Sequence, residues 1–194
     1  RYGNPSIKKI LYNSIERGFR DITILPMFPQ YSTTTTLSIF ALIKDLIKKD
    51  EKYFSGVNIK AVSSFHDNNF YIKACATKIR SAQKLLSKPD KLLFSFHGIP
   101  QSYIGKDEPY QKECLHTAHL IAKELELTHT EYEIAFQSRF GKAEWIKPYL
   151  SSRLEKLPEE GVTNLHVFCP GFSSDCLETI DEIGRESKED YFEH

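Results

Sequence analysis

The sequence predicts an α/β protein built on parallel β-sheet. Short apolar runs alternate with longer segments that have helical periodicity, and each of these runs ends in a polar loop with Pro, His, Gln or Gly. This alternation, together with strands that are continuously apolar, is typical of parallel sheets flanked by helices. The length of 194 residues and the apolar content of 40% allow one large domain or two small ones with hydrophobic cores.

The expected strands are the runs at 21–25, 58–63, 91–96, 132–136 and 164–169. The expected helices lie near 5–17, 34–49, 69–86, 109–126, 142–156 and 175–190. In the fourth of these helices, Cys114, Ala118 and Ile121 recur at helical spacing and form an apolar stripe. The segments SSFHD and FSFHG resemble each other, which favours two similar halves, a first domain at 1–88 and a second at 89–194.

Charge and cysteine content narrow the class of protein. Lys plus Arg and Asp plus Glu balance at 26 each, so the composition gives no reason to expect a nucleic acid partner. No stretch approaches the roughly 20 apolar residues that span a bilayer, and no secretory signal is expected before the first polar turn. The four cysteines form no CxxC pair, which indicates reduced thiols and a cytoplasmic protein rather than a zinc finger.

The loops after the five expected strands predict one shared cleft. In open α/β sheets, ligands bind beyond the carboxyl ends of the strands, where these loops lie. His97 directly follows the strand at 91–96, and Gly98 and Pro100 make a tight turn after it. A neutral imidazole there can accept a proton or bind a metal. A hydrogen bond to a neighbouring carbonyl group is the structural alternative, and position alone does not decide between the two.

An acidic stripe follows the last expected strand. Glu178 and Glu182 lie four residues apart, so an α-helix places both carboxylates on one side, which suits a cation path or a proton acceptor. Asp175 and Glu178 also fit a helix-capping arrangement in which Glu178 reaches back to the helix start. On these residues alone, capping is a serious alternative, and a solvated helix face is the favoured interpretation.

Two further segments contain histidines with ordinary structural explanations. His66 is followed by Asp67, which is expected to cap the next helix. His116 and His119 lie three residues apart on an expected helix, a spacing that can chelate a metal, but no third ligand follows them. The pattern therefore favours surface residues at these two positions.

Residue types that bind ligands also occur in two other loops. Tyr31 and the hydroxyls of Ser32 and Thr33 precede a helix start where an anion could sit, although N-capping by Ser32 or Thr33 is the favoured interpretation. Beyond another strand, Arg139 could hold a carboxylate and Trp145 could line a flat apolar ligand. A surface pair and a core anchor are the alternatives for these two.

Six segments, taken in sequence order, carry a resemblance to a known family. They are RYGNPSI (1–7), PMFPQYS (26–32), SFHDN (64–68), FSFHGIP (94–100), FQSRFG (136–141) with Trp145, and VFCPGFSSDCLETIDEI (167–183). Together they cover nearly the whole chain and resemble ferrochelatase, the terminal enzyme of haem synthesis, most closely in its bacterial type. Only this resemblance, and not the periodicity, implies a porphyrin substrate.

The resemblance implies two Rossmann-like domains with small parallel sheets that enclose a porphyrin. It also implies a lyase of haem and porphyrin biosynthesis, which inserts Fe²⁺ into protoporphyrin IX to form protohaem. His97 matches the family's active-site histidine and Glu178 the facing acidic residue, the two usually assigned as ferrous-iron ligands. Glu182 matches a further acidic position behind Glu178. Which of His97 and Glu178 is the base and which the metal ligand stays open.

Four further residues fall in segments that match the family, and several features of the chain depart from it. Arg1, Tyr2 and Tyr31 fall in segments near the porphyrin cleft, and Trp145 falls in one close to it. The family's opening strands and its closing strand and helix have no counterpart, so we expect a central portion truncated at both ends. Animal members have a second histidine where this chain has Cys176. The cysteine tail that binds an iron–sulfur cluster is missing, so we expect no such cluster.

Several alternatives to this function stay open. One is a chelatase for another tetrapyrrole or metal, of the coproporphyrin or cobalt type. Another is a non-catalytic tetrapyrrole-binding module, against which the presence of both His97 and Glu178 argues. A nucleotide-binding α/β domain is disfavoured because the chain has no GxGxxG or GxxxxGK[ST] motif. Peripheral membrane contact would suit a greasy substrate, and the sequence predicts no oligomeric state.

Overall fold

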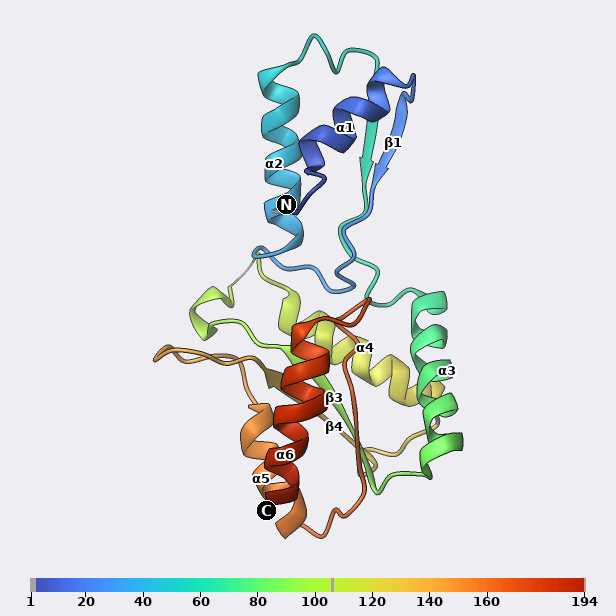
Figure 1. Cartoon of the computed structure of the whole chain (residues 1–194), viewed down its shortest axis with the longest axis vertical. Coiled ribbons are helices and arrows are strands. Elements are labelled where there is room, and N and C mark those ends of the chain that lie inside the picture. The colour runs from blue at the N-terminus through green and yellow to red at the C-terminus, as the bar shows by residue number, and fades with distance from the viewer. Residues whose placement is uncertain (1–2, 106, 194) are drawn as a thin grey trace.

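Two parallel sheets organise the chain, as the sequence predicts (Figure 1). The computed structural model describes residues 3–105 and 107–193. The smaller sheet pairs β1 (Asp21–Ile24) with β2 (Asn58–Ala61). The larger sheet has the strand order β4-β3-β5, with β3 (Lys91–His97) in the centre. Its outer strands are β4 (Tyr132–Gln137) and β5 (Leu165–Phe168). The α/β fold class with parallel sheets and flanking helices is confirmed.

Two helices pack on the smaller sheet, α1 (Ile7–Glu16) and α2 (Thr36–Lys49). Ser6 caps α1, because its side-chain oxygen accepts a hydrogen bond from the backbone N–H of Lys9 at 3.2 Å. A cap of this kind typically stabilises a helix by about 1 kcal/mol. The two helices and the segment after α2 form one buried core. Its residues are Leu11, Ile15, Ile43, Leu46 and Phe54.

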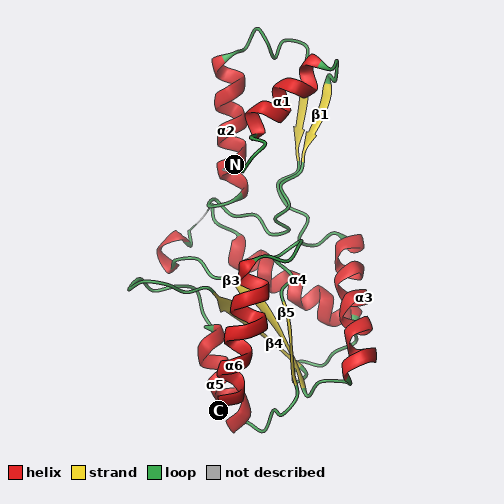
Figure 2. Ribbon diagram, viewed as in Figure 1, coloured by secondary structure: helices red, strands yellow, loops and turns green. Residues whose placement is uncertain are grey.

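Both faces of the larger sheet are covered by helices (Figure 2). On one face lie α3 (Asn69–Leu86) and α4 (Tyr110–Glu124). On the other lie α5 (Leu150–Glu159) and a carboxy-terminal segment that consists of the π-helix η2 (Glu178–Ser187) and α6 (Lys188–Glu193). A central strand with two covered faces needs no polar side, which explains why the run before His97 is apolar apart from the buried Ser95.

Side chains of β3 alternate between the two faces. Phe94 and Phe96 are fully buried in the core that contains α3 and α4, whereas Leu93 is fully buried in the core that contains α5. Ile72 and Ile79 of α3 share the first of these cores, so α3 packs with the larger sheet. The division into domains at 1–88 and 89–194 stays a prediction.

The helix expected near 142–156 begins only at Leu150. The prediction of a helix is therefore wrong for its first half, residues 142–149. Residues 142–149 instead form an irregular segment with bends and isolated bridges at Trp145 and Tyr149, in which the N–H of Ile146 donates to the carbonyl oxygen of Ile99 at 3.0 Å. The carbonyl oxygen of Pro148 accepts from the N–H of Phe136 at 2.8 Å. Pro148 lacks an N–H of its own and disfavours helical geometry at the residue before it. These backbone bonds to neighbouring segments replace those of a helix.

The last expected helix is present, but it is not a uniform α-helix. Residues Glu178–Ser187 form a π-helix, in which hydrogen bonds join residues i and i+5, and α6 continues the same segment. Glu178 begins this π-helix, and Glu182 lies about one turn further along it.

The loop after β1 joins the smaller body to α4. Gln30 is almost fully buried, and its Nε2 donates to Thr117 Oγ1 at 2.9 Å. The next residue, Tyr31, donates its backbone N–H to the Glu113 carboxylate at 2.7 Å. Through these bonds, the two sheets present their strand ends to a common region. Across residues 3–105 and 107–193, no helix is both long and apolar enough to cross a membrane.

Candidate active site

A cleft of about 390 Å³ lies at the carboxyl ends of the strands. It is lined by loop residues that follow β1, β3, β4 and β5, so four of the five expected loops contribute to it. The loop after β2, at 62–68, is not among the lining segments in the described part of the chain. The lining residues are Phe28, Gln30, Ser32, Thr34, Thr35, His97, Gly98, Ile99, Pro100, Tyr103, Tyr110, Phe140, Trp145, Gly171, Phe172 and Glu178. The expectation of one cleft shared by several loops is therefore confirmed for these four.

Apolar side chains make up most of the cleft wall. Phe28 comes from the loop after β1, Ile99 from the loop after β3, and Phe172 from the loop after β5. Trp145 is only 5% exposed, and its ring centroid lies 6.3 Å from that of His97. Such a wall suits a large, flat, apolar ligand with few polar contacts.

His97 is the last residue of β3 rather than the first residue after it, and its side chain lines the cleft. Its Nδ1 lies 2.6 Å from the carbonyl oxygen of Gly98. A carbonyl oxygen only accepts hydrogen bonds, so Nδ1 carries the hydrogen, and the lone pair of a neutral ring is on Nε2. Tyr110 donates its hydroxyl to the carbonyl oxygen of His97 at 2.9 Å, which fixes the strand end. The structure therefore contains the expected structural hydrogen bond and leaves the second nitrogen for chemistry.

Glu178 lies at the first position of η2 and lines the same cleft as His97. The Cys176 thiol, the backbone N–H of Glu178 and the nearby His97 all favour the charged carboxylate, so the pKa of Glu178 lies below its usual value of 4.5. Glu178 is therefore ionised at neutral pH. The anionic oxygen of Glu178 and the Nε2 atom of His97 together form a pair that can bind a divalent cation or accept protons.

The capping arrangement of Asp175 and Glu178 is wrong, because Thr179 takes the place of Glu178. Thr179 Oγ1 donates to Asp175 Oδ1 at 3.1 Å and accepts from the backbone N–H of Cys176 at 3.0 Å. A threonine hydroxyl serves both partners, so the carboxylate of Glu178 is not needed at the helix start. The side chain is left to line the cleft.

Glu182 lies apart from the cleft and binds the end of β4. Its carboxylate accepts hydrogen bonds from the backbone N–H and the hydroxyl of Ser138, each at 2.6 Å, and from Gln137 Nε2 at 3.1 Å. In this π-helix, Glu178 and Glu182 have different surroundings. The predicted acidic stripe is therefore divided into a cleft residue and a residue that attaches η2 to the sheet.

The other predicted site residues have different positions. Trp145 lines the cleft. Tyr31 lies between the cleft residues Gln30 and Ser32, but its side chain is not among the lining groups. Burial raises the pKa of its hydroxyl, as do the nearby carboxylates of the 107–113 segment. Arg1 and Tyr2 lie outside the described residues.

Comparison with known proteins decides the family. The sequence model of the family described as ferrochelatase matches residues 1–194, the whole chain. The chain belongs to the ferrochelatase family. It is 43% identical over 194 residues to a ferrochelatase of Idiomarina loihiensis, covering 100% of this chain and 52% of the relative. It is 45% identical over 194 residues to a ferrochelatase of Hydrogenovibrio crunogenus, covering 100% of this chain and 50% of the relative.

The chain spans about half the length of the curated relatives it matches. A third relative, the ferrochelatase of Pseudoalteromonas atlantica, is 43% identical over 192 residues, covering 99% of this chain and 52% of that protein. The resemblance drawn from the six sequence segments is therefore confirmed at the level of the family.

Sequence reasoning missed the buried carboxylate of Glu108, which lies beside the cleft. Glu108 is 6% exposed and accepts hydrogen bonds from the Ser32 hydroxyl at 3.1 Å and from the Thr33 backbone N–H at 2.8 Å. The interpretation of Ser32 or Thr33 as the cap of α2 is wrong, because the N-cap is Thr35 and it makes no side-chain bond. The run STTTT was a usable signal in the sequence, since five successive hydroxyl residues exceed what one helix cap requires.

His66 and its neighbour Asp67 lie outside the cleft. Asn68, and not Asp67, caps α3, because the side-chain oxygen of Asn68 accepts from the N–H of Phe70 at 3.0 Å. The expectation that Asp67 caps this helix is wrong. His119 is exposed and its Nδ1 lies 2.6 Å from the carbonyl oxygen of Leu115.

Proposed function

We propose that the protein inserts Fe²⁺ into protoporphyrin IX to form protohaem, as a lyase of haem biosynthesis. The observation that carries this proposal is the position of His97 and Glu178, which come from the end of β3 and the start of η2 and line one largely apolar cleft. Membership of the ferrochelatase family supports the proposal, because the curated relatives have that name. Both substrates, the porphyrin and the ferrous ion, are part of the proposal.

The chemistry needs a proton acceptor and a cation-binding group close together. Inserting a divalent metal into a porphyrin displaces two pyrrole protons, and the metal must lose water as it enters. Nε2 of His97 is the atom that can accept a proton or bind the metal, because Nδ1 is held by the Gly98 carbonyl group. Glu178 is anionic at neutral pH, so it can attract the cation or pass a proton on. The proposal includes both assignments: His97 as the base with Glu178 as the metal ligand, or the reverse.

Aromatic side chains are the proposed contacts of the macrocycle. Phe28, Phe172 and Trp145 line the cleft from three different loops, so they can contact a flat ring from several directions. A ring held in this way is accessible to His97 and Glu178 at its nitrogen atoms, and distortion of the ring would expose those nitrogens further. Trp145 is the only tryptophan of the chain, so its fluorescence reports on this wall directly.

Two properties of the whole protein belong to the same proposal. A cytoplasmic location is supported by Cys75, Cys114, Cys169 and Cys176, which are free thiols in the structure. Peripheral contact with a membrane is supported by large apolar side chains that are exposed beside the cleft, since Phe140 and Leu177 are each 73% exposed.

Anaerobic metallation by the full-length protein tests the proposal. Protoporphyrin IX and Fe²⁺ are mixed with wild type, His97→Ala and Glu178→Gln, and haem formation is followed by absorbance. We expect each variant to lose at least about 100-fold in rate, as general acid–base groups typically contribute about 10²–10⁴-fold. His119→Ala and Glu186→Gln change the same residue types at exposed positions outside the cleft and are expected to retain the rate.

Other outcomes would favour the alternatives. Faster metallation of coproporphyrin, or of protoporphyrin with Co²⁺, would indicate a chelatase for another tetrapyrrole or metal. A wild-type protein that quenches porphyrin fluorescence, but forms no metallated product with any of these substrates, would be a binding module. Unchanged rates in His97→Ala and Glu178→Gln would refute the roles given to these residues.

A further inference from the structure

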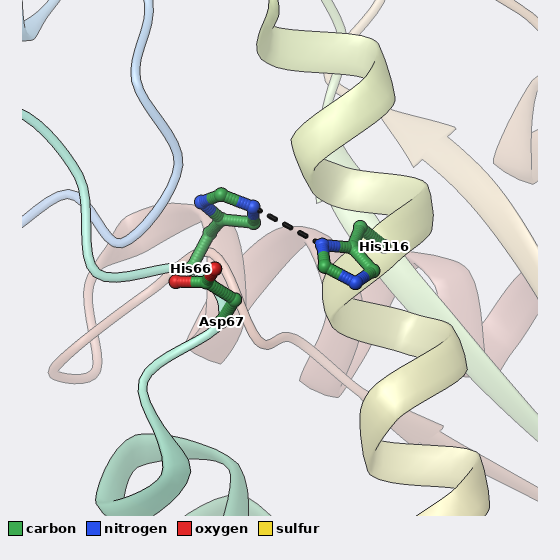
Figure 3. Close-up of side chains that lie close together, drawn as sticks. All are labelled: His66, Asp67 and His116. Atoms are coloured by element: carbon green, nitrogen blue, oxygen red, sulfur yellow. Dashed lines mark hydrogen bonds between the residues drawn. The ribbon is translucent and has the colours of Figure 1, made fainter.

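We propose that His66, Asp67 and His116 form a binding site for a first-row divalent metal ion, separate from the His97–Glu178 pair. His66 and Asp67 lie in the loop after β2, and His116 lies on α4 (Figure 3). One potential ligand atom from each residue lies within 4.8 Å of the other two. None of the three residues lines the cleft. This inference rests on the geometry of these side chains and does not depend on the proposed function.

The two imidazoles have the spacing that a single metal ion requires. His66 Nε2 and His116 Nδ1 are 3.3 Å apart, and Figure 3 draws this contact as a hydrogen bond between the two ring nitrogens. Two nitrogens at a metal–nitrogen distance of 2.0–2.1 Å and a tetrahedral angle lie about 3.3 Å apart. The observed separation thus fits two ligands of one tetrahedral ion without movement of the backbone.

Neighbouring groups fix the tautomer of His66 that a metal needs. The Ser64 hydroxyl donates to the Glu113 carboxylate at 2.7 Å, so its oxygen is left to accept from His66 Nδ1 at 2.8 Å. Glu113 Oε2 itself lies 3.2 Å from the same nitrogen. With the hydrogen on Nδ1, the lone pair of the neutral ring is on Nε2, the atom that faces His116. A carboxylate behind a ligating histidine is a common feature of metal sites and orients the ring.

Asp67 is free to supply the third ligand. It is exposed, and the capping of α3 is done by Asn68. A rotation of this exposed side chain brings an oxygen into the coordination sphere, since it already lies within 4.8 Å of both nitrogens. Two imidazoles and one carboxylate are ligands of Zn²⁺, Co²⁺ and Fe²⁺ rather than of Ca²⁺ or Mg²⁺, and three protein ligands leave a position for water.

The site is connected to the cleft through hydrogen bonds. Thr117, the residue after His116, donates its hydroxyl to the carbonyl oxygen of His66 at 2.9 Å. The same hydroxyl accepts from Gln30 Nε2 at 2.9 Å, and Gln30 lines the cleft. A metal that holds His66 against His116 would therefore also hold the loop after β2 against α4, next to the residues that support the cleft wall.

Zinc binding by the full-length protein tests the site. Zn²⁺ is titrated in competition with a chromophoric chelator, in a His97→Ala, Glu178→Gln background in which the cleft pair cannot bind it. We expect one equivalent of Zn²⁺ to bind, and His116→Ala to weaken its affinity at least about tenfold. His119→Ala, which removes an exposed histidine one turn along the same helix, is the matched control and is expected to retain the affinity.

A second metal and a second variant keep the test independent of folding. Co²⁺ bound to nitrogen and oxygen ligands absorbs visible light, and we expect this absorption to be lost in Asp67→Asn and His116→Ala, which alter exposed side chains only. Circular dichroism confirms that both variants fold. If His116→Ala and His119→Ala bind Zn²⁺ with the same stoichiometry and affinity, or if the background protein binds no equivalent, His66, Asp67 and His116 form no metal site.

Discussion

Gln137, the last residue of β4, donates a hydrogen bond from Nε2 to the backbone carbonyl oxygen of Glu178, the first residue of η2, at 3.0 Å. Gln137 is 2% exposed and pairs in register with His97 on β3. Its Oε1 accepts from the Ser95 hydroxyl at 2.7 Å. One buried amide therefore connects the strand end that presents His97 to the helix start that presents Glu178.

Replacing Gln137 by Ala should destabilise the protein and weaken the site together. The substitution leaves the buried Ser95 hydroxyl and the Glu178 carbonyl oxygen without their partner, at a cost of about 1–3 kcal/mol in unfolding free energy. We expect urea denaturation to give a lower midpoint, and metallation to be slower because η2 is less firmly held. Gln101→Ala, at an exposed position of the short η1 helix (Gln101–Tyr103), serves as control. Equal midpoints for the two variants would contradict this role.

Glu182 should contribute to stability as an anchor of η2. Its carboxylate accepts three hydrogen bonds, from Ser138 N, Ser138 Oγ and Gln137 Nε2. A neutral amide accepts through only one of its two terminal atoms, so we expect Glu182→Gln to lower the unfolding free energy by about 1–3 kcal/mol. Glu186→Gln alters an exposed carboxylate of the same helix and is expected to change stability by less than about 0.5 kcal/mol. Equal losses in the two variants would show that Glu182 is no special anchor.

Strand positions were predicted well because a central parallel strand leaves a clear pattern. The segment 91–96 is apolar except for Lys91 and Ser95, since both faces of β3 are covered, and the structure adds only His97 to it. The first half of the helix expected at 142–156 was wrong because the hydrogen bonds of 142–149 go to residues distant in sequence, such as Ile99 and Phe136. Local periodicity contains no information about such partners.

For the site, the sequence identified the residues that end strands but not their partners. His97 and Glu178 stood out through position and through the family resemblance, and both line the cleft. The separate surroundings of Glu178 and Glu182 were not predictable, because the partners of Glu182, Gln137 and Ser138, lie 45 and 44 residues away in the sequence. His66 and His116 are 50 residues apart, so their proximity appears only in the folded chain.

The charge of Glu178 should depend most strongly on Cys176. The Cys176 thiol is the largest of the groups that lower the pKa of Glu178 below 4.5, and His97 is a smaller one. We therefore expect Cys176→Ala to raise this pKa more than His97→Ala does. Titration of the glutamate carboxyl ¹³C signals measures both shifts. The pKa of Asp90, which is lowered by the N–H groups of Thr163 and Asn164, is an internal reference and is expected to stay unchanged.

The same shift gives an acid dependence of stability with a definite sign. Because the pKa of Glu178 is lower in the folded state than its usual value of 4.5, ionised Glu178 stabilises the fold above about pH 4.5. This contribution is lost as the pH falls through the folded-state pKa, and it is smaller in Cys176→Ala. Stability curves of wild type and Cys176→Ala should converge at low pH. A larger separation in acid than at neutral pH would contradict the assignment.

Gly98 should tolerate no side chain, because the turn after β3 packs directly against Trp145. A Cβ atom at residue 98 would lie 3.1 Å from the carbonyl oxygen of Gln137 and 3.1 Å from Cε3 of Trp145. We expect Gly98→Ala to cost about 1–3 kcal/mol in unfolding free energy, as overpacking does in dense cores. It should also shift the fluorescence of Trp145, the single tryptophan. Gly105→Ala is the matched control, since a Cβ there meets no atom within 4 Å. An unshifted spectrum with wild-type stability would mean that the indole ring can move aside, and that the wall beside His97 is less rigid than its burial indicates.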